Sequence, residues 1–307
     1  MAKATLLLPA RSRFPAGELP AQVAAALGRA ERSLGTVGES AQLSRHFSVQ
    51  PADWSAAALT RQADAGDAEG GFWMRADPAS IVPDMQGARL MASAESLRLE
   101  QADIDALLPA LQPLFAGFGY QLDAPTPSRW YLRLPEDTPL PRFADPETVL
   151  GDDLFSHLPD GDNGRQWRSL MTEAQVVLHQ HPWNEQRVAQ GKRAVNSLWF
   201  WGAGRLPESV GTAHAQVRSR DALVQGLATL AGVRLGGEQT VDALVDLRQL
   251  RSLEQLTRDA ITPLLAAINR GELAELLLDF EDGASYRIRR WQRWQFWKKP
   301  LNALADE

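Results

Sequence analysis

The feature that most constrains the fold of this chain is a bulky run, VNSLWFWGAG, at residues 195–204. Side chains alternate between the two faces of a strand, so Leu198 and Phe200 share one face and Trp199 and Trp201 share the other. Large side chains on both faces predict a buried strand with other elements packed on each side. The glycines that end the run allow a sharp turn or the close approach of a ligand.

An amphipathic helix is predicted just before this strand, beginning near Gln166 and ending before Pro182. Its apolar positions recur at helical spacing and are Trp167, Leu170, Met171, Ala174, Val177 and Leu178. A polar stripe on another side holds Arg168, Thr172, Gln175 and His179, which lie three or four positions apart. Such a stripe could hold a phosphate or a carboxylate. The alternative is the solvated face of an ordinary surface helix.

From this central stretch we predict a site for a small anionic ligand. Its residues are Arg168, Gln175, His179, Asn184, Arg187 and Asn196, with Arg168 and Arg187 as the anion clamps. Arg11 and Arg13 are further candidates for anion contacts because they follow an apolar strand at residues 5–8, and open α/β sheets bind ligands beyond the carboxyl ends of their strands. The alternative for these two is that of ordinary solvated loop residues.

The sequence predicts no catalytic residue, metal ligand or cofactor. His179 and His181 lie two positions apart, so on a helix they would point in different directions, and no third ligand is spaced to join them. A serine triad of Ser197, His179 and Glu173 lacks the G-x-S-x-G turn that would expose its nucleophile. The GAG at residues 202–204 does not complete a G-x-G-x-x-G phosphate loop.

The order of predicted elements indicates an α/β fold with a mixed, largely parallel sheet and flanking helices. An apolar strand opens the chain and a helix follows at residues 18–32, while strands and helices alternate again from residue 221 to residue 280. We predict one domain over residues 1–307, with an α+β subdomain at 71–140 and a basic aromatic tail at 284–307. The proline- and aspartate-containing segment 140–160 is the most plausible internal boundary.

Composition excludes several classes of function. The 307 residues carry a net charge of −6, which repels polyanions and argues against nucleic-acid binding. Cysteine is absent, so disulfides, thiolate metal sites and a cysteine nucleophile are excluded. The apolar run at residues 4–10 is too short for a signal peptide, and no stretch has the length of a membrane span. We therefore predict a cytoplasmic protein whose partner is a small anionic ligand or another protein.

A second unusual segment, YRIRRWQRWQFWKKP, occupies residues 286–300. Interleaved cations and aromatic rings, including Arg290 and Arg293, could contact nucleic acid or a membrane surface. The interpretation that we favour is packing of these side chains against the acidic body of the protein, with cation–π contacts.

The central motifs resemble the proteobacterial "regulatory protein, RpfE type" family. That family has a W-R…E-x-Q…H-x-H-P-x-N-x-x-R block followed by N-S-L-W-x-W-G-x-G. The matching residues here are Trp167, Arg168, Glu173, Gln175, His179, His181, Pro182, Asn184, Arg187, Asn196, Ser197, Trp199, Trp201, Gly202 and Gly204. WMRADP at residues 73–78, RWYLRL at 129–134 and the C-terminal segment fit the same family, so the resemblance covers most of the chain.

Members of that family are often described as cofactor-independent phosphoglycerate mutases. The resemblance thus implies a fold similar to that of alkaline phosphatase, with two divalent metals and a serine or threonine nucleophile. Here the first strand ends in Leu8-Pro9-Ala10, where such an enzyme would present a metal-binding aspartate, and His214 is the sole histidine after His181. We therefore expect a non-catalytic or catalytically degenerate relative with a regulatory or binding role. The alternatives are an active metal-dependent mutase, or association with nucleic acid or a membrane through the tail.

Overall fold

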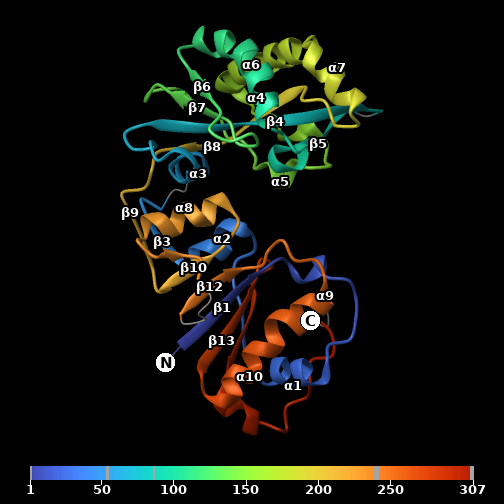
Figure 1. The fold of residues 1–307 in the computed structure, drawn as a ribbon, viewed down its shortest axis with the longest axis vertical. Helices are drawn as coiled ribbons and strands as arrows, with labels where there is room; N and C mark the ends of the chain where they lie inside the picture. The colour runs from blue at the N-terminus through green and yellow to red at the C-terminus, as the bar shows by residue number, and fades with distance from the viewer. Residues whose placement is uncertain (1, 53–54, 86, 238–241, 305–307) are drawn as a thin grey trace. The chain divides into compact units, whose positions relative to one another are not determined.

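The computed structural model describes residues 2–52, 55–85, 87–237 and 242–304. The chain forms two compact units (Figure 1): unit 1 combines residues Met1–Ala52 with Glu208–Glu307, and unit 2 is Asp53–Pro207. This differs from the prediction of a single domain over 1–307. Each unit has its own apolar core, and the two largest cores share no residue. The predicted boundary at 140–160 and the predicted subdomain at 71–140 both lie inside unit 2.

Unit 1 is built on a largely parallel sheet, which confirms the predicted α/β class. Within the described residues its strand order is β11-β10-β12-β1-β13-β14-β2. The strands are β11 (Arg234–Leu235), β10 (Gln216–Arg218), β12 (Ala243–Asp246), β1 (Ala2–Leu8), β13 (Leu273–Phe280), β14 (Ala284–Arg289) and β2 (Glu31–Leu34). β1 is parallel to both β12 and β13, and β10 is parallel to β11 and β12, whereas β14 returns antiparallel to β13. The first six residues of the predicted C-terminal tail therefore form a strand of this sheet.

Helices cover both faces of the unit 1 sheet. The helical segments are η1 (Arg11–Arg13), α1 (Ala21–Arg29), α2 (Glu39–Ser44), α8 (Ala222–Leu230), α9 (Leu253–Gln255), the π-helical η4 (Leu256–Ile261), α10 (Thr262–Arg270) and η5 (Arg290–Trp294). α1 and α10 pack on one face, where Leu6 and Leu8 of β1 join their core. Because strand residues alternate, Leu7 points to the opposite face. A small two-stranded sheet joins β3 (Phe47–Gln50) to β9 (Ser209–Thr212).

Unit 2 is built on an antiparallel sheet. β4 (Phe72–Asp84) pairs with β5 (Gly87–Ser93), β7 (Tyr131–Leu134) and β8 (Ser197–Gly204), and β6 (Gln121–Asp123) pairs with β7. The helical segments of this unit are α3 (Ala56–Ala65), η2 (Ala94–Leu97), α4 (Gln101–Ala116), α5 (Pro146–Val149), η3 (Leu154–His157), α6 (Gly161–His179) and α7 (Pro182–Ala189). α6 and α3 both contact β8, whose Leu198, Trp199 and Phe200 are at most 1% exposed. The predicted burial of this strand is confirmed.

Two helices of unit 2 accommodate prolines. α7 begins at Pro182, and its N-cap His181 accepts a hydrogen bond at Nδ1 from the Trp183 amide. α4 continues through Pro109 and Pro113. Its apolar side, with Leu107, Leu111 and Phe115 fully buried, holds the helix together across the two prolines.

Candidate functional site

The most polar part of unit 1 lies at the carboxyl edge of its parallel strands. Leu7 of β1 is in register with Asp246 of β12 on one side and with Asp279 of β13 on the other. Ser219, the residue after β10, donates a 2.6 Å hydrogen bond to Asp246. We call Ser219, Asp246, Leu7 and Asp279 the edge row. In open α/β sheets this edge is where ligands bind.

Asp279 is held by an arginine and a histidine from the end of α2. The Arg45 guanidinium grips both carboxylate oxygens, with Nε and Nη2 at 3.0 and 2.7 Å, and His46 Nε2 lies 2.6 Å from Oδ2. Burial alone would raise the pKa of Asp279, but the hydrogen bonds from His46 and Arg45 outweigh it and hold the pKa below its usual value. The Asp279 carboxylate is thus ionised, and both of its oxygens already make hydrogen bonds with side chains of the same chain.

A second imidazole extends this arrangement. His214 Nε2 lies 3.2 Å from His46 Nδ1, so Asp279, His46 and His214 form a continuous line of polar contacts. Burial, with the charge on His46 as a smaller cause, lowers the pKa of His214 to about 4. His214 is therefore neutral at physiological pH. A carboxylate that orients one imidazole against another is an arrangement suited to proton transfer or to binding a polar ligand.

Both carboxylate oxygens of Asp246 likewise accept hydrogen bonds from an arginine, Arg248. Nε and Nη2 of Arg248 donate to the two carboxylate oxygens at 2.9 and 2.8 Å. The same guanidinium contacts Asp221 at 3.1 Å and also pairs with Glu39. Burial works to lower the pKa of Arg248, but Asp246 and the other two carboxylates raise it. One buried arginine therefore neutralises acids from α2, the start of α8 and β12.

This donor set does not fit the two divalent metals that the family resemblance implies. Metal-binding carboxylates need free oxygen lone pairs, whereas those of Asp246 and Asp279 accept from arginines. Leu7 puts an alkyl side chain between them, in the row where a third oxygen ligand would lie. Over the described ranges, no three histidine or acidic side chains are grouped as a metal ion would require.

The structure gives Arg11 and Arg13 different surroundings. Both lie in η1, just beyond the end of β1, as the sequence indicated. Arg11 Nε donates to Asp282 at 2.9 Å and Nη1 donates to the Tyr286 hydroxyl at 3.3 Å. The Asp282 carboxylate therefore already balances the positive charge of Arg11. Arg13 is exposed. An external anion is therefore more accessible to Arg13 than to Arg11.

The predicted stripe on α6 does not converge on one point. Arg168 donates to the Pro159 carbonyl, Gln175 to the Ser197 hydroxyl at 3.2 Å, and His179 is exposed at the end of the helix. Arg168 and His179 are eleven positions apart in a continuous helix, which corresponds to about 16 Å. The two ends of the stripe are too distant to clamp the same small anion.

The other three predicted ligand residues have partners within unit 2. Asn184 donates to the carbonyls of Leu178 and Val195, both at 2.8 Å. Arg187, which is 1% exposed, pairs with Asp103 at 2.7 Å. Asn196 accepts from the Ile81 amide and donates to the Ile81 carbonyl, each at 2.8 Å. These contacts join α7 and β8 to their neighbours, and ligand binding by the six central residues stays a prediction.

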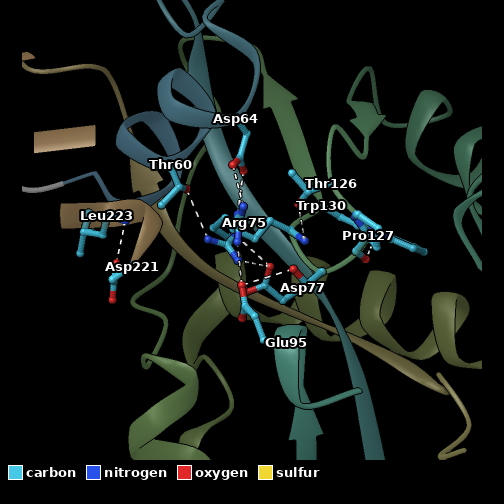
Figure 2. A network of polar contacts seen from close by, with 12 residues as sticks. Thr60, Asp64, Arg75, Asp77, Glu95, Thr126, Pro127, Trp130, Asp221 and Leu223 are labelled. Carbon is cyan, nitrogen blue, oxygen red and sulfur yellow. Dashed lines mark hydrogen bonds and ion pairs between the residues drawn. The ribbon is translucent and has the colours of Figure 1, made fainter. Parts of the chain in front are cut away.

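Unit 2 also contains a buried network centred on Arg75 and Asp77 of β4. Figure 2 shows these two side chains in contact, with Thr60 and Asp64 of α3 and Glu95 of η2 around them. Arg75 Nη2 lies 2.7 Å from Asp77 Oδ1, and the two side chains are 4% and 1% exposed. Trp201 donates to the second Asp77 oxygen at 2.6 Å, and its ring lies 5.2 Å from the Arg75 guanidinium carbon.

This network extends to a second carboxylate, Asp64. The Tyr131 hydroxyl donates to Asp64 at 2.5 Å, and Arg129 grips both Asp64 oxygens at 2.7 and 2.8 Å. Burial raises the pKa of Tyr131, so the phenol stays protonated and keeps donating. The polar groups in this network satisfy one another, which is typical of a structural core.

Sequence reasoning missed the acids of the edge row and the two histidines, His46 and His214, that continue from Asp279. The available signal was an aspartate at the end of two apolar strands, in ALVD at 243–246 and LLLDF at 276–280. Because parallel strands end at the same edge, these two aspartates could have been placed together. His46 carries no comparable signal, since its partner Asp279 lies 233 positions away.

No protein-family model matches the chain. Similar curated proteins include a "Probable 2,3-bisphosphoglycerate-independent phosphoglycerate mutase" of Geobacter sulfurreducens, 34% identical over 94 residues, and a 2,3-bisphosphoglycerate-independent phosphoglycerate mutase of Methanothrix thermoacetophila, 33% identical over 107 residues. These matches cover 29% and 32% of this chain but 23% and 27% of those proteins, so the similarity spans about a quarter of the length of the relatives.

Two solved structures align with most of the chain. The cofactor-independent phosphoglycerate mutase of Thermoplasma acidophilum matches with a TM-score of 0.40 and 13% identity, over 94% of this chain and 90% of that one. A protein of Pyrococcus horikoshii matches with a TM-score of 0.47 and 12% identity, over 94% and 88%. Within the described residues, no helix combines the length and the apolar character that crossing a bilayer demands.

Proposed function

We propose that this chain is a phosphoglycerate-mutase-like protein that does not carry out two-metal catalysis and that binds a small anionic ligand in a regulatory role. The partial sequence similarity to phosphoglycerate mutases supports the relationship. The observation that carries the loss of catalysis is the edge row, in which arginines occupy both carboxylates and Leu7 separates them. The regulatory role rests on the resemblance of the central motifs to the RpfE-type family.

In this proposal the guanidinium groups of Arg45 and Arg248, and not metal ions, balance the negative charges of Asp279 and Asp246. A divalent cation bound to Asp246 or Asp279 would have to displace Arg248 or Arg45 from a bidentate contact. The positive charge at the edge is therefore part of the chain itself. The edge carboxylates therefore need no bound metal ion to balance their negative charge.

We place the anionic ligand at the carboxyl edge of unit 1. The segments after β1 and β10 carry Arg13 and Arg220, which are both exposed. Among the described residues neither has a carboxylate within ion-pair distance. Exposed arginines can grip a phosphate or carboxylate with two parallel hydrogen bonds. The central residues Arg168 and His179 are the second candidate location, and a protein partner is the alternative occupant.

An activity assay tests the loss of catalysis. Purified chain loaded with Mn²⁺ or Mg²⁺ is expected not to convert 3-phosphoglycerate to 2-phosphoglycerate. Conversion at an enzyme-like rate that a chelator abolishes would establish the alternative, an active metal-dependent mutase, which the similarity to mutases favours. The Asp279→Asn variant is the matched control, because an active two-metal enzyme would lose its rate when an edge carboxylate is removed.

Thermal shift measurements locate the ligand. Inorganic phosphate or 3-phosphoglycerate is expected to raise the melting temperature of the wild-type chain, since a ligand that binds only the folded state stabilises it. Arg13→Ala and Arg220→Ala should remove this shift without changing the melting temperature of the free protein. Loss of the shift in Arg168→Ala or His179→Ala instead would move the site to α6. If no anion shifts the wild type, the small-anion proposal is wrong.

A further inference from the structure

The C-terminal segment of unit 1 exposes four large aromatic side chains. Trp291 is 55% exposed, Trp294 65%, Phe296 79% and Trp297 69%. We call these four residues the aromatic face. The sequence favoured packing of the rings against the body of the protein, and the structure differs. In η5 and the residues after it, the buried positions belong to Gln292, Leu301 and Leu304, so the rings are left outside.

The aromatic face is held on a fixed support. Before it, β14 pairs with β13, and Gln292 bonds back to Arg289 and Arg287. After it, the Leu301 amide donates to the Ala24 carbonyl at 2.9 Å. The backbone between these anchors crosses α1 so closely that a Cβ on Gly28 would lie 2.1 Å from the Lys299 carbonyl oxygen. The rings are therefore presented from an ordered segment.

Cations without acidic partners surround these rings. Arg29, Arg290 and Arg293 have no carboxylate within ion-pair distance among the residues that the structure describes. Lys298 and Lys299 follow the rings in the chain and are exposed. This local positive charge contrasts with the net charge of −6 of the whole chain.

A pocket adjoins the aromatic face. It encloses about 160 Å³ and is lined by Arg29, Arg289, Arg290 and Arg293 above an apolar floor that includes Leu265 and Ile268. Arg289 pairs with Glu275 at 2.7 Å, whereas the charges of the other three arginines are not balanced by a carboxylate among the described residues. The buried Nε of Arg29 has no hydrogen-bond partner. The guanidinium groups that line this pocket can donate paired hydrogen bonds to a phosphate group.

We propose that this surface docks on an anionic phospholipid membrane, with the aromatic face inserted at the headgroup level and a lipid phosphate in the arginine pocket. Tryptophan prefers the membrane interface because its ring is apolar and its N–H is polar. Clustered cations beside such rings favour anionic lipids. An acidic protein partner could also neutralise the positive charge of this surface. Protruding rings, however, insert more easily into the fluid interface of a bilayer than into the rigid surface of a folded protein. This surface contains no residue of the edge row, so the proposal does not depend on the proposed function.

Co-sedimentation of the full chain with lipid vesicles tests the proposal. The protein is expected to bind vesicles of phosphatidylcholine with phosphatidylserine, but not vesicles of phosphatidylcholine alone. Binding should fall as salt is raised, because the Debye length shrinks from about 10 Å at 0.1 M to about 3 Å at 1 M. Equal binding to both vesicles, or binding to neither, would overturn the proposal.

Two variants separate the aromatic and the cationic contributions. Trp294→Ala with Trp297→Ala should abolish binding, and both side chains are exposed enough to be removed without unfolding the chain. Arg290→Glu with Arg293→Glu should weaken binding at least about 25-fold, since each cation near an anionic surface contributes about five-fold. Phe155→Ala with Arg165→Glu is the matched control, because both residues are exposed in unit 2. It should bind like the wild type.

Sedimentation velocity without lipid distinguishes the other occupants. The wild type and the Trp294→Ala/Trp297→Ala variant are expected to have the same mass in solution. A wild-type dimer that the variant cannot form would assign the aromatic face to self-association and overturn the proposal. Retention of vesicle binding by both double variants would overturn it as well.

Discussion

The edge row of unit 1 and the Arg75 network of unit 2 use the same chemical pairing in different surroundings. Each joins aspartates to arginines through two hydrogen bonds or more. In unit 2 the Arg75 and Asp77 side chains are 4% and 1% exposed, and aromatic rings enclose them. In unit 1 the Arg45 side chain that holds Asp279 is 28% exposed, and a titratable histidine pair continues the network.

From this comparison we expect burial, and not the identity of the pair, to decide its role. In a dry site a charge that loses its partner has nothing to replace it, so the pair mainly stabilises the fold. Near solvent, water or an external anion can replace a partner, and the pair is available for binding. We therefore expect substitutions in unit 2 to affect stability, and substitutions at the edge of unit 1 to affect pH dependence and ligand response. Four measurements test this difference.

The largest effect is expected from Asp77→Ala in unit 2. The change leaves Arg75 buried with no carboxylate and removes the acceptor of Trp201, so the free energy of unfolding should fall by about 3–5 kcal/mol. Urea unfolding of the variant measures the loss. The control is Asp84→Ala, whose pair with Arg89 is exposed and screened by water, so its loss should be far smaller. Equal losses in the two variants would contradict the role of burial.

A smaller loss is expected from Asp279→Asn at the edge of unit 1. Arg45 and His46 would lose their charged acceptor, which should cost about 2 kcal/mol at neutral pH. The folded pKa of Asp279 is below its usual value, so its contribution is present above about pH 4, the unfolded value, and is lost as pH falls further. The variant should therefore show a shallower loss of stability in acid. Identical acid limbs in urea titrations would contradict this.

His214 should make stability depend on pH in a higher window. Its folded pKa of about 4 is below the ordinary value of 6.5, so the unfolded chain binds a proton first as pH falls. Stability should therefore decrease from pH 6.5 to pH 4, by about 1–2 kcal/mol after allowance for the partial exposure of the ring. His214→Asn should remove this decrease. A variant that loses as much stability as the wild type between pH 7 and pH 4.5 would show that the ring is not desolvated.

The smallest effect is expected from His179→Ala on α6. This side chain is exposed at the helix end, so the free energy of unfolding should change by no more than about 0.5 kcal/mol. Arg187→Met, within the same predicted ligand set, should destabilise unit 2 strongly because it leaves Asp103 without its buried partner. Equal effects of the two changes, measured in the same urea titration, would mean that the six central residues act as one set.

Local patterns in the sequence were sufficient for much of the fold. The apolar run of β1 and the alternation of strands and helices from residue 221 to residue 280 were sufficient to predict a largely parallel sheet, and both faces of β8 were correctly expected to be covered. The division into two units was missed because unit 1 is formed by two segments separated in sequence. No local change in composition marks residues 52 and 208 as the points where the chain leaves and re-enters this unit.

The candidate site was less predictable than the fold because its contacts are long-range. His46 is adjacent in sequence to nothing that suggests a site, and it acquires a role only when β13 brings Asp279 within 2.6 Å. Conversely, Arg187 and Asn184 stand in a motif that suggests function, but their buried partners show that they join secondary-structure elements. Residue type and spacing cannot distinguish an internal acceptor from a ligand.

The pairing of the edge acids with Arg45 and Arg248 has a consequence for how the protein behaves in a changing environment. A bound ion exchanges with the pool of free ions, so its occupancy follows their concentration. A guanidinium group is attached to the backbone and keeps its proton at any physiological pH. Starvation for divalent ions would leave the charge balance at the edge of unit 1 unaltered, so the response to an anionic ligand that we propose would not depend on the supply of metal ions.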